Sequence, residues 1–203
     1  MEIVSKLRCF AILLVFLGFL IRHRSSAEKV LLVPPPDSGS HWMALAKIGR
    51  ALVDRGHIVT VVISEDIAKK RRTECPGFHF ETFQDQGTRA RLQGLVDQSH
   101  SVAGEQSIYK LGEVLMSMNE GFKQYCSLFL ADNNLISQLK TSRYSVVISD
   151  PFFPCGAVIS AHLDSRVPHV AVMRGDPFFL DEKATGVPLP RSYVPFLPTD
   201  FYR

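Results

Sequence analysis

The feature that most constrains this chain is a series of short, almost unbroken apolar runs separated by longer helical patterns. The clearest run covers residues 58–63, where five of six residues are valine or isoleucine and the sixth is Thr60. Such a run is typical of a parallel strand covered on both faces, since parallel sheets leave neither face to water. The alternation of strands and helices predicts an α/β fold, a Rossmann-like doubly wound parallel sheet.

The same two patterns, short apolar runs and longer helical repeats, place the other elements. Further strands are expected at 30–33, 78–83, 144–149 and 169–173, and helices at 41–55, 107–130, 131–140 and 156–163. Residues 84–106 are polar, contain glycine and show little periodicity, so we expect a mobile loop region there. The basic clusters at 69–72 and 89–91 are expected to be solvated faces. Beyond Gly175 prolines accumulate and no helix closes the domain.

The first 27 residues have the pattern of a secretory signal peptide. Lys6 and Arg8 precede thirteen mostly apolar residues, 9–21, and small residues follow at 25–27. The apolar stretch is shorter than the roughly 20 residues that span a bilayer, which favours cleavage over a signal anchor. Removing four basic residues and one acidic residue from the chain's 23 and 20 leaves 19 of each. A formal charge of zero gives no sign of a nucleic-acid partner.

Cysteine and motif content limit the chemistry further. Cys75, Cys126 and Cys155 remain after the leader, so at most one disulfide can form within the chain and at least one thiol stays free or pairs with another chain. Their spacing fits no metal site. The sequence also contains no dinucleotide-binding loop, no phosphate-binding loop and no zinc-protease motif. We therefore expect neither a metal nor a bound cofactor.

His41 and Asp150 are candidates for acid–base chemistry, because each follows a predicted strand, at 30–33 and 144–149. With the usual strand order 3-2-1-4-5, these two strands are neighbours across the switch point. Both side chains then emerge at the carboxyl edge of the sheet, where ligands bind. A carboxylate partner would orient the imidazole and stabilise the imidazolium that forms when the ring takes a proton from an acceptor hydroxyl.

Structural roles compete with each of these assignments. His41 can be a polar residue at a helix start, and Ser40 is expected to cap that helix through its hydroxyl. Aspartate before proline, as at Asp150, is also a common turn arrangement. The methionine and aromatic stripe within 107–130 fits a core better than a binding pocket. The other histidines of the mature chain are expected to begin a strand (His57) or to be structural or surface residues (His79, His100, His162 and His169).

Five segments resemble the N-terminal half of a UDP-glucuronosyltransferase, most closely the vertebrate family-one enzymes. They are Ser38-Gly39-Ser40-His41-Trp42, Arg55-Gly56-His57, Asp150-Pro151-Phe152-Phe153-Pro154-Cys155-Gly156, Arg174-Gly175 and Pro190-Arg191-Ser192-Tyr193-Val194-Pro195. One such segment is weak support for a family. Five in family order, together covering nearly the whole chain, make a specific match.

The resemblance implies a GT-B glycosyltransferase, with two Rossmann-like domains that face each other across a cleft. In that family the N-terminal domain binds a small lipophilic acceptor, and the C-terminal domain binds the UDP-sugar, here UDP-glucuronate. The histidine matching His41 deprotonates the acceptor hydroxyl, Asp150 assists it, and Ser40, Trp42 and Phe152 are expected to contact substrate. The sugar transfers with inversion and without a metal. Family members lie in the endoplasmic reticulum lumen, held by a C-terminal transmembrane helix.

The resemblance also bears on the extent of the chain. Residues 28–203 correspond to the acceptor-binding domain, so the donor domain and the membrane anchor are expected to be absent and the chain alone to be inactive. The alternative is a non-catalytic binding or regulatory module that pairs with full-length family members in a homo- or hetero-oligomer. The entry loop at 34–40 is slightly longer than usual, and Val187 stands where the family usually has cysteine, which leaves the disulfide pairing open. Residues 84–125 are expected to line the acceptor pocket.

Overall fold

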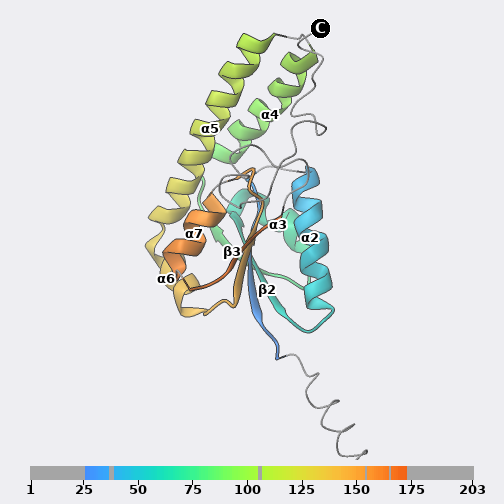
Figure 1. Ribbon diagram of the computed structural model, residues 1–203, viewed down its shortest axis with the longest axis vertical. Coiled ribbons are helices and arrows are strands. Elements are labelled where there is room, and N and C mark those ends of the chain that lie inside the picture. Colours follow the sequence, from blue (N-terminus) through green and yellow to red (C-terminus); the bar gives the residue numbers. More distant parts are fainter. Residues whose placement is uncertain (1–25, 37–38, 105–106, 154, 165, 173–203) are drawn as a thin grey trace, which may run out of the picture.

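A parallel five-stranded sheet forms the centre of the molecule. The computed structural model describes residues 26–36, 39–104, 107–153, 155–164 and 166–172. The strands are β1 (Lys29–Val33), β2 (Ile58–Ser64), β3 (His79–Phe83), β4 (Val146–Ser149) and β5 (His169–Ala171), in the order β3-β2-β1-β4-β5 (Figure 1). The chain winds outward in both directions from β1 and β4, which defines the switch point of a Rossmann-like sheet. The predicted fold class and strand order are therefore confirmed.

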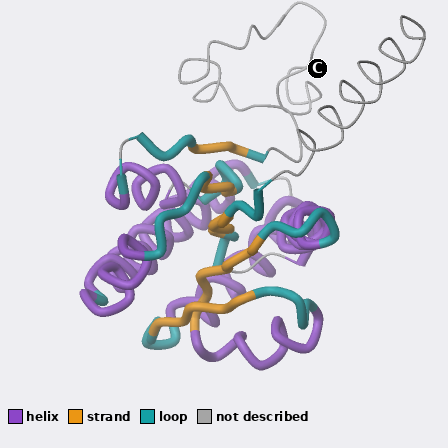
Figure 2. Tube along the Cα trace, turned by 90° about the horizontal axis from the view of Figure 1, so that it is seen from below, coloured by secondary structure: helices purple, strands orange, loops and turns teal. Residues whose placement is uncertain are grey.

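Helices cover both faces of this sheet, as Figure 2 shows. On one face lie α2 (Gly39–Val53) and α3 (Glu65–Glu74), and on the other lie α4 (Thr88–Gly104), α5 (Ile108–Ala131), α6 (Asn133–Thr141) and α7 (Cys155–Leu163). Because successive side chains of a strand point to opposite faces, Val30 and Leu32 pack with the first group, and Leu31 and Val33 pack with the second. Burial on both faces explains the unbroken apolarity of these strands.

The expectation of a loop over residues 84–106 is wrong for most of that stretch, because α4 occupies Thr88–Gly104. Leu92 of α4 is 1% exposed and lies against Gly121 of α5, where a Cβ would come within 2.5 Å of a Leu92 methyl carbon. Val102 is buried at the same interface. Packing against α5 stabilises the helix, as it does most helices in proteins, and the polar composition of the segment conceals this contact.

A second helix that the periodicity did not predict is α3. Its first turn carries Glu65 and Asp66 and its last turn Arg71 and Arg72, an order that complements the helix dipole. Only Ala68 of this helix is fully buried. A helix with so narrow an apolar face has no clear hydrophobic stripe, which is why the sequence showed only a basic cluster at 69–72.

The longest of the described helices, α5, runs beside α4, and the two extend past the carboxyl edge of the sheet (Figure 1). The residues of its expected methionine and aromatic stripe, Met118, Phe122 and Phe129, are buried in the core, whereas Leu115 is exposed. The stripe is therefore mainly core, as expected. At the far end, Asp132 begins α6 by accepting a hydrogen bond from the Leu135 N–H at 3.0 Å.

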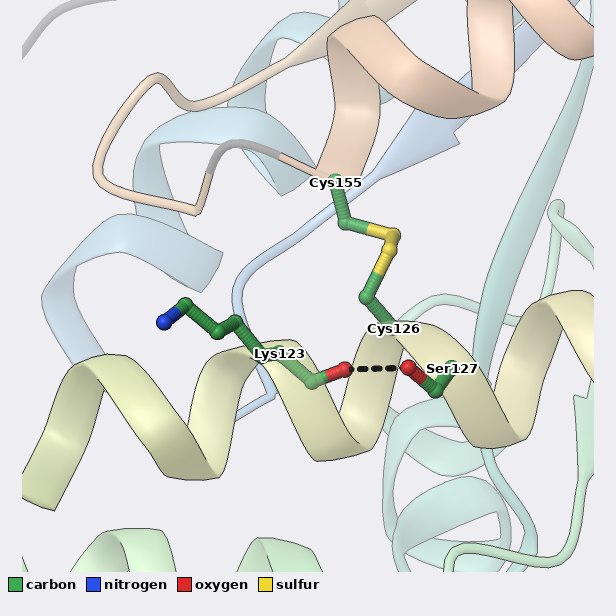
Figure 3. Close-up of a disulfide and its surroundings, with 4 residues drawn as sticks. All are labelled: Lys123, Cys126, Ser127 and Cys155. Carbon is green, nitrogen blue, oxygen red and sulfur yellow. Dashed lines mark hydrogen bonds between the residues drawn. A yellow bond between two sulfur atoms is a disulfide. The ribbon is translucent and has the colours of Figure 1, made fainter.

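One disulfide joins α5 to α7 on the face of the sheet that the helices α4 to α7 cover. Cys126 of α5 bonds to Cys155, the first residue of α7, with 5.7 Å between their Cα atoms (Figure 3). Beside it the Ser127 hydroxyl donates a hydrogen bond to the Lys123 carbonyl one turn earlier in α5. Cys75 is a buried free thiol. The pairing that the sequence left open is thus Cys126 with Cys155, which is consistent with the limit of one disulfide.

Several expectations fall outside the described residues. They concern the signal peptide as far as residue 25, the segments at 174–175 and 190–195, and Val187. Within the part of the chain that the structure does describe, none of the helices is both long enough and apolar enough to span a bilayer.

Candidate active site

Asp150 follows β4 directly, and its side chain is only 3% exposed. The register of β1 with β4 pairs Val33 with Ser149, so the ends of both strands lie side by side at the carboxyl edge. Pro151 prevents the strand from continuing, and the chain turns. In that turn the carboxylate Oδ1 accepts a hydrogen bond from the Phe152 N–H at 2.9 Å, and the backbone carbonyl accepts one from the Phe153 N–H at 3.0 Å. The turn leaves Oδ2 for another partner.

That partner is His41, in the first turn of α2. Its Nδ1 lies 2.5 Å from Oδ2 of Asp150, and its side chain is 27% exposed. Because an ionised carboxylate can only accept hydrogen bonds, Nδ1 is the donor. In the neutral ring the lone pair then lies on Nε2, the nitrogen farther from the carboxylate. The structure thus brings together the two residues that strand order placed at one edge.

Phe152 completes this group. Its ring stacks against the imidazole of His41, with 5.2 Å between the ring centroids and an angle of 29° between the planes. The Phe122 ring of α5 meets the Phe152 ring edge-on, with 5.5 Å between the two ring centroids. The imidazole is therefore held by a carboxylate at Nδ1 and an aromatic ring against its face. The sequence indicated Phe152 by name, whereas it included Phe122 only as one residue of the stretch 84–125 that is expected to line the acceptor pocket.

Ser40 and Trp42 flank His41 in sequence but differ from it in surroundings. The helix begins at Gly39, so Ser40 lies inside the first turn with an exposed side chain and does not occupy the cap position. The expectation of a Ser40 cap is therefore wrong, because the helix starts before that residue. The indole of Trp42 is buried in the core on the face covered by α2 and α3. Whether either side chain contacts substrate stays a prediction.

The indole of Trp42 has its own set of partners on α3. Its Nε1 donates to Glu74 Oε2 at 2.8 Å, and the guanidinium of Arg71 lies 4.6 Å from the ring centroid. Arg71 also forms an ion pair of 2.7 Å with Glu74. Burial opposes the charge of Glu74, but the hydrogen bonds from Arg71 and Trp42 outweigh it and lower the pKa of that carboxyl. Trp42 thus joins α2 to α3.

Several hollows border the predicted acceptor-binding stretch at 84–125. One, of about 480 Å³, lies between the start of α2 and the helices α3 and α4, and is lined by Gly39, Ile67, Lys70, Arg71, Arg89, Ala90 and Gln93. Another, of about 800 Å³, follows the seam between α4 and α5 on residues such as Arg91, Met116 and Lys123. Gly39, which lines the first of these hollows, lies two residues before His41 in the sequence. An acceptor pocket in this stretch stays a prediction.

Two polar groups near the site have hydrogen-bond partners of their own. Ser149, next to Asp150, shares a hydrogen bond of 2.7 Å with Nε2 of His169, and partial burial lowers the pKa of that imidazole. Burial raises the pKa of Tyr125, whose hydroxyl accepts the Ser64 N–H at 3.1 Å. Tyr125 is therefore a neutral structural group. No group of three or more possible metal ligands occurs among the described residues.

Comparison with known proteins extends this description. Residues 28–202 match a model of the family described as UDP-glucoronosyl and UDP-glucosyl transferase. UDP-glucuronosyltransferase 1-2 of Rattus norvegicus is 32% identical over 176 residues, which cover 84% of this chain and 32% of that protein. UDP-glucuronosyltransferase 2A1 of Homo sapiens is 28% identical over 170 residues, which cover 79% of this chain and 32% of that protein. The chain spans about a third of the length of the curated relatives it matches.

Solved structures show more distant similarities. The glycotransferase of kitacinnamycin is 14% identical with a TM-score of 0.42, over 79% of this chain and 34% of that chain. CalG4, the calicheamicin glycosyltransferase, is 17% identical with a TM-score of 0.43, over 81% of this chain and 38% of that chain. The family match over residues 28–202 is the decisive finding, and by it the chain belongs to the UDP-glucoronosyl and UDP-glucosyl transferase family.

Proposed function

We propose that this chain is the acceptor-binding part of a GT-B UDP-glucuronosyltransferase that transfers glucuronate from UDP-glucuronate to the hydroxyl of small lipophilic acceptors. His41 is the general base and Asp150 its partner. The observation that carries the proposal is the 2.5 Å contact between Nδ1 and Oδ2, since it leaves the lone pair of a partly exposed imidazole on Nε2. That arrangement is what abstraction of a hydroxyl proton needs.

In the proposed reaction, Nε2 takes the proton while the acceptor oxygen forms a bond to the anomeric carbon of the sugar. The bond from that carbon to the diphosphate oxygen breaks, UDP leaves with the electron pair, and the configuration inverts. Asp150 holds the ring in the tautomer that can accept a proton and stabilises the imidazolium once it forms. Proton transfer of this kind contributes about 10²–10⁴-fold to a rate. The step requires no metal or cofactor besides the co-substrate.

The extent of the chain supports a division of labour. Because it covers about a third of its curated relatives, we propose that binding of the UDP-sugar requires the remaining two thirds, and that these 203 residues alone do not turn over. We place the protein in the endoplasmic reticulum lumen. The Cys126–Cys155 disulfide supports this location, because such bonds persist in oxidising compartments.

The test uses a chimera in which residues 28–203 replace the matching part of the Rattus norvegicus relative. We expect transfer from UDP-glucuronate to a simple phenol, and a loss of about 10²–10⁴-fold in kcat for His41→Ala. His57→Ala is the matched control. His57 lies at the amino edge of the sheet, where its Nδ1 accepts the Glu28 N–H at 3.2 Å, and its loss should leave kcat within about twofold. A His41→Ala rate equal to the control rate would eliminate His41 as the base.

A further inference from the structure

The Cys126–Cys155 disulfide lies at the end of the same short loop that carries Asp150. We propose that this disulfide is a redox-dependent clamp on the His41–Asp150 pair, acting through Phe152, so that reduction of the bond releases the imidazole from its fixed position. The catalytic consequence rests on the proposed function, whereas the effect on the geometry of the pair does not.

The first connection is covalent. Only four residues separate Asp150 from Cys155, which starts α7, and the bond ties this point to α5. The side chain of Cys155 is buried, whereas Cys126 is half-buried. Both ends of the loop are therefore fixed, one by the pairing of β4 with β1 and the other by the sulfur bridge.

The second connection is made by aromatic rings. Phe122 lies one helical turn before Cys126 on α5, and its centroid is 5.5 Å from Phe152 and 5.6 Å from Phe153. Tyr125 also meets Phe153, at 5.8 Å. Phe152 in turn stacks on His41. The bridge keeps α5 and the loop at the separation that these ring contacts need, so it acts on the imidazole through one intervening ring.

The domain itself does not depend on this bond alone. Behind the loop, α7 is held by Ile159 in the core and by a close approach of Gly156 to Ser149. α5 is held by its long contact with α4 and by the buried residues Met118 and Phe129. Reduction should therefore relax the loop between Asp150 and Cys155 while the sheet and helices remain.

The redox step is an ordinary thiol–disulfide exchange. A thiolate of dithiothreitol attacks the sulfur of Cys126, the more accessible of the two, and Cys155 leaves as a thiolate that takes up a proton. The second thiol of the reagent then closes its own disulfide and releases Cys126. Two electrons pass from the reagent to the chain, which ends with two thiols.

The experiment is nuclear magnetic resonance of the 15N-labelled chain with and without dithiothreitol. In the oxidised chain we expect a His41 Nδ1–H signal, ring nitrogens of a single tautomer and a nuclear Overhauser effect between the rings of His41 and Phe152. Reduction, or the double variant Cys126→Ser with Cys155→Ser, should remove the Overhauser effect and average the tautomers. Signals of His57, at the opposite edge of the sheet, should not move. Cys75→Ser, the matched control, should respond to the reagent as the unaltered chain does.

Two results would overturn the proposal. One is an unchanged His41 signal in the reduced chain. The other is a simultaneous collapse of all histidine signals, because the bond would then hold the domain and not the site. Phe152→Leu provides an independent check in the oxidised chain, since it keeps the bridge and removes the stacked ring. It should release the His41 ring in the same way, and an unaffected tautomer in this variant would equally contradict the clamp. None of these readouts depends on sugar transfer, so failure of the proposed function leaves them intact.

Discussion

At the scale of single residues, the site depends on one carboxylate that has both oxygens in use. Oδ2 of Asp150 holds His41, and Oδ1 accepts the Phe152 N–H that shapes the turn. Asparagine has nearly the same shape and can keep the turn bond, but it lacks the charge that stabilises an imidazolium. The two functions of Asp150 can therefore be separated by substitution.

We predict that Asp150→Asn in the chimera lowers kcat for a phenol by about 10²–10⁴-fold with little change in thermal stability. Asp150→Ala should lose the same activity and also destabilise the domain, because the Phe152 N–H loses its acceptor. Asp164→Asn is the control, since Asp164 follows α7 directly and pairs at 2.9 Å with the exposed Arg166. Steady-state kinetics and thermal unfolding check the three variants. An Asp150→Asn rate near the control rate would contradict the assigned role.

Glycines give a second test at this scale. A Cβ at Gly156 would come within 2.2 Å of the Cβ and Oγ of Ser149, whereas nothing lies within 4 Å of a Cβ at Gly94 in α4. Gly156→Ala should lower the free energy of unfolding by about 1–3 kcal/mol through overpacking. Gly94→Ala should raise it by about 0.5–1 kcal/mol, because alanine is the better helix former. Urea titrations measure both, and a destabilising Gly94→Ala would contradict the helical assignment of α4.

At the scale of elements, the strands and four of the six described helices were predicted, whereas α3 and α4 were not. In a segment with Thr88, Arg89 and Arg91 at its start, the apolar residues are few. Those present, Leu92, Leu95, Val96 and Val102, nevertheless share one side of a helix and pack against α5. Leu95 and Val96 follow Leu92 by three and four residues, and Val102 follows Leu95 by seven, which is the helical spacing that could have revealed the helix. The more numerous polar residues masked this spacing. The surface of α5 against which the apolar residues pack exists only in the folded chain, so the sequence could not show it.

The contact between α4 and α5 predicts non-additive energies. Leu92→Ala should cost about 2–5 kcal/mol of unfolding free energy, because it opens a cavity at a fully buried position. Gly121→Ala alone should cost about 1–3 kcal/mol, since its Cβ would meet the Leu92 side chain. In the double variant the new methyl group occupies part of the space that leucine left. Urea unfolding should therefore show a total cost below the sum of the two, whereas strict additivity would contradict this packing.

At the scale of the whole molecule, the pairing of His41 with Asp150 was predictable because parallel strands bring their carboxyl ends to one edge. Strand order alone placed both residues there, and the structure brings them within 2.5 Å. The aromatic support from Phe122 and the choice of Cys126 as the partner of Cys155 depend on how α5 lies across the sheet. That orientation results from the packing of several helices at once, so no local pattern encodes it.

The pH dependence of stability also belongs to the whole molecule. Burial lowers the pKa of His169 in the folded chain below the value of about 6.5 expected in the unfolded chain. Below about pH 6.5 the unfolded chain therefore binds more protons at this histidine than the folded chain does. The stability that is present above this pH is lost as the pH falls through the lowered pKa of the folded chain. His169→Gln, which can keep a hydrogen bond to Ser149, should lose less unfolding free energy between pH 7.5 and acidic pH. Equal losses in the two proteins, measured by urea titration, would contradict this.

The central claim is that His41 removes a proton from an acceptor hydroxyl. A phenol must lose its proton as it attacks, whereas a neutral amine attacks with its own lone pair and can release its proton later. The most direct measurement is therefore the ratio of kcat for a phenol to kcat for an aryl amine in the chimera, with and without His41→Ala. We predict that the substitution lowers this ratio by about 10²-fold or more, because only the phenol reaction loses its base. A ratio unchanged by His41→Ala would contradict the account.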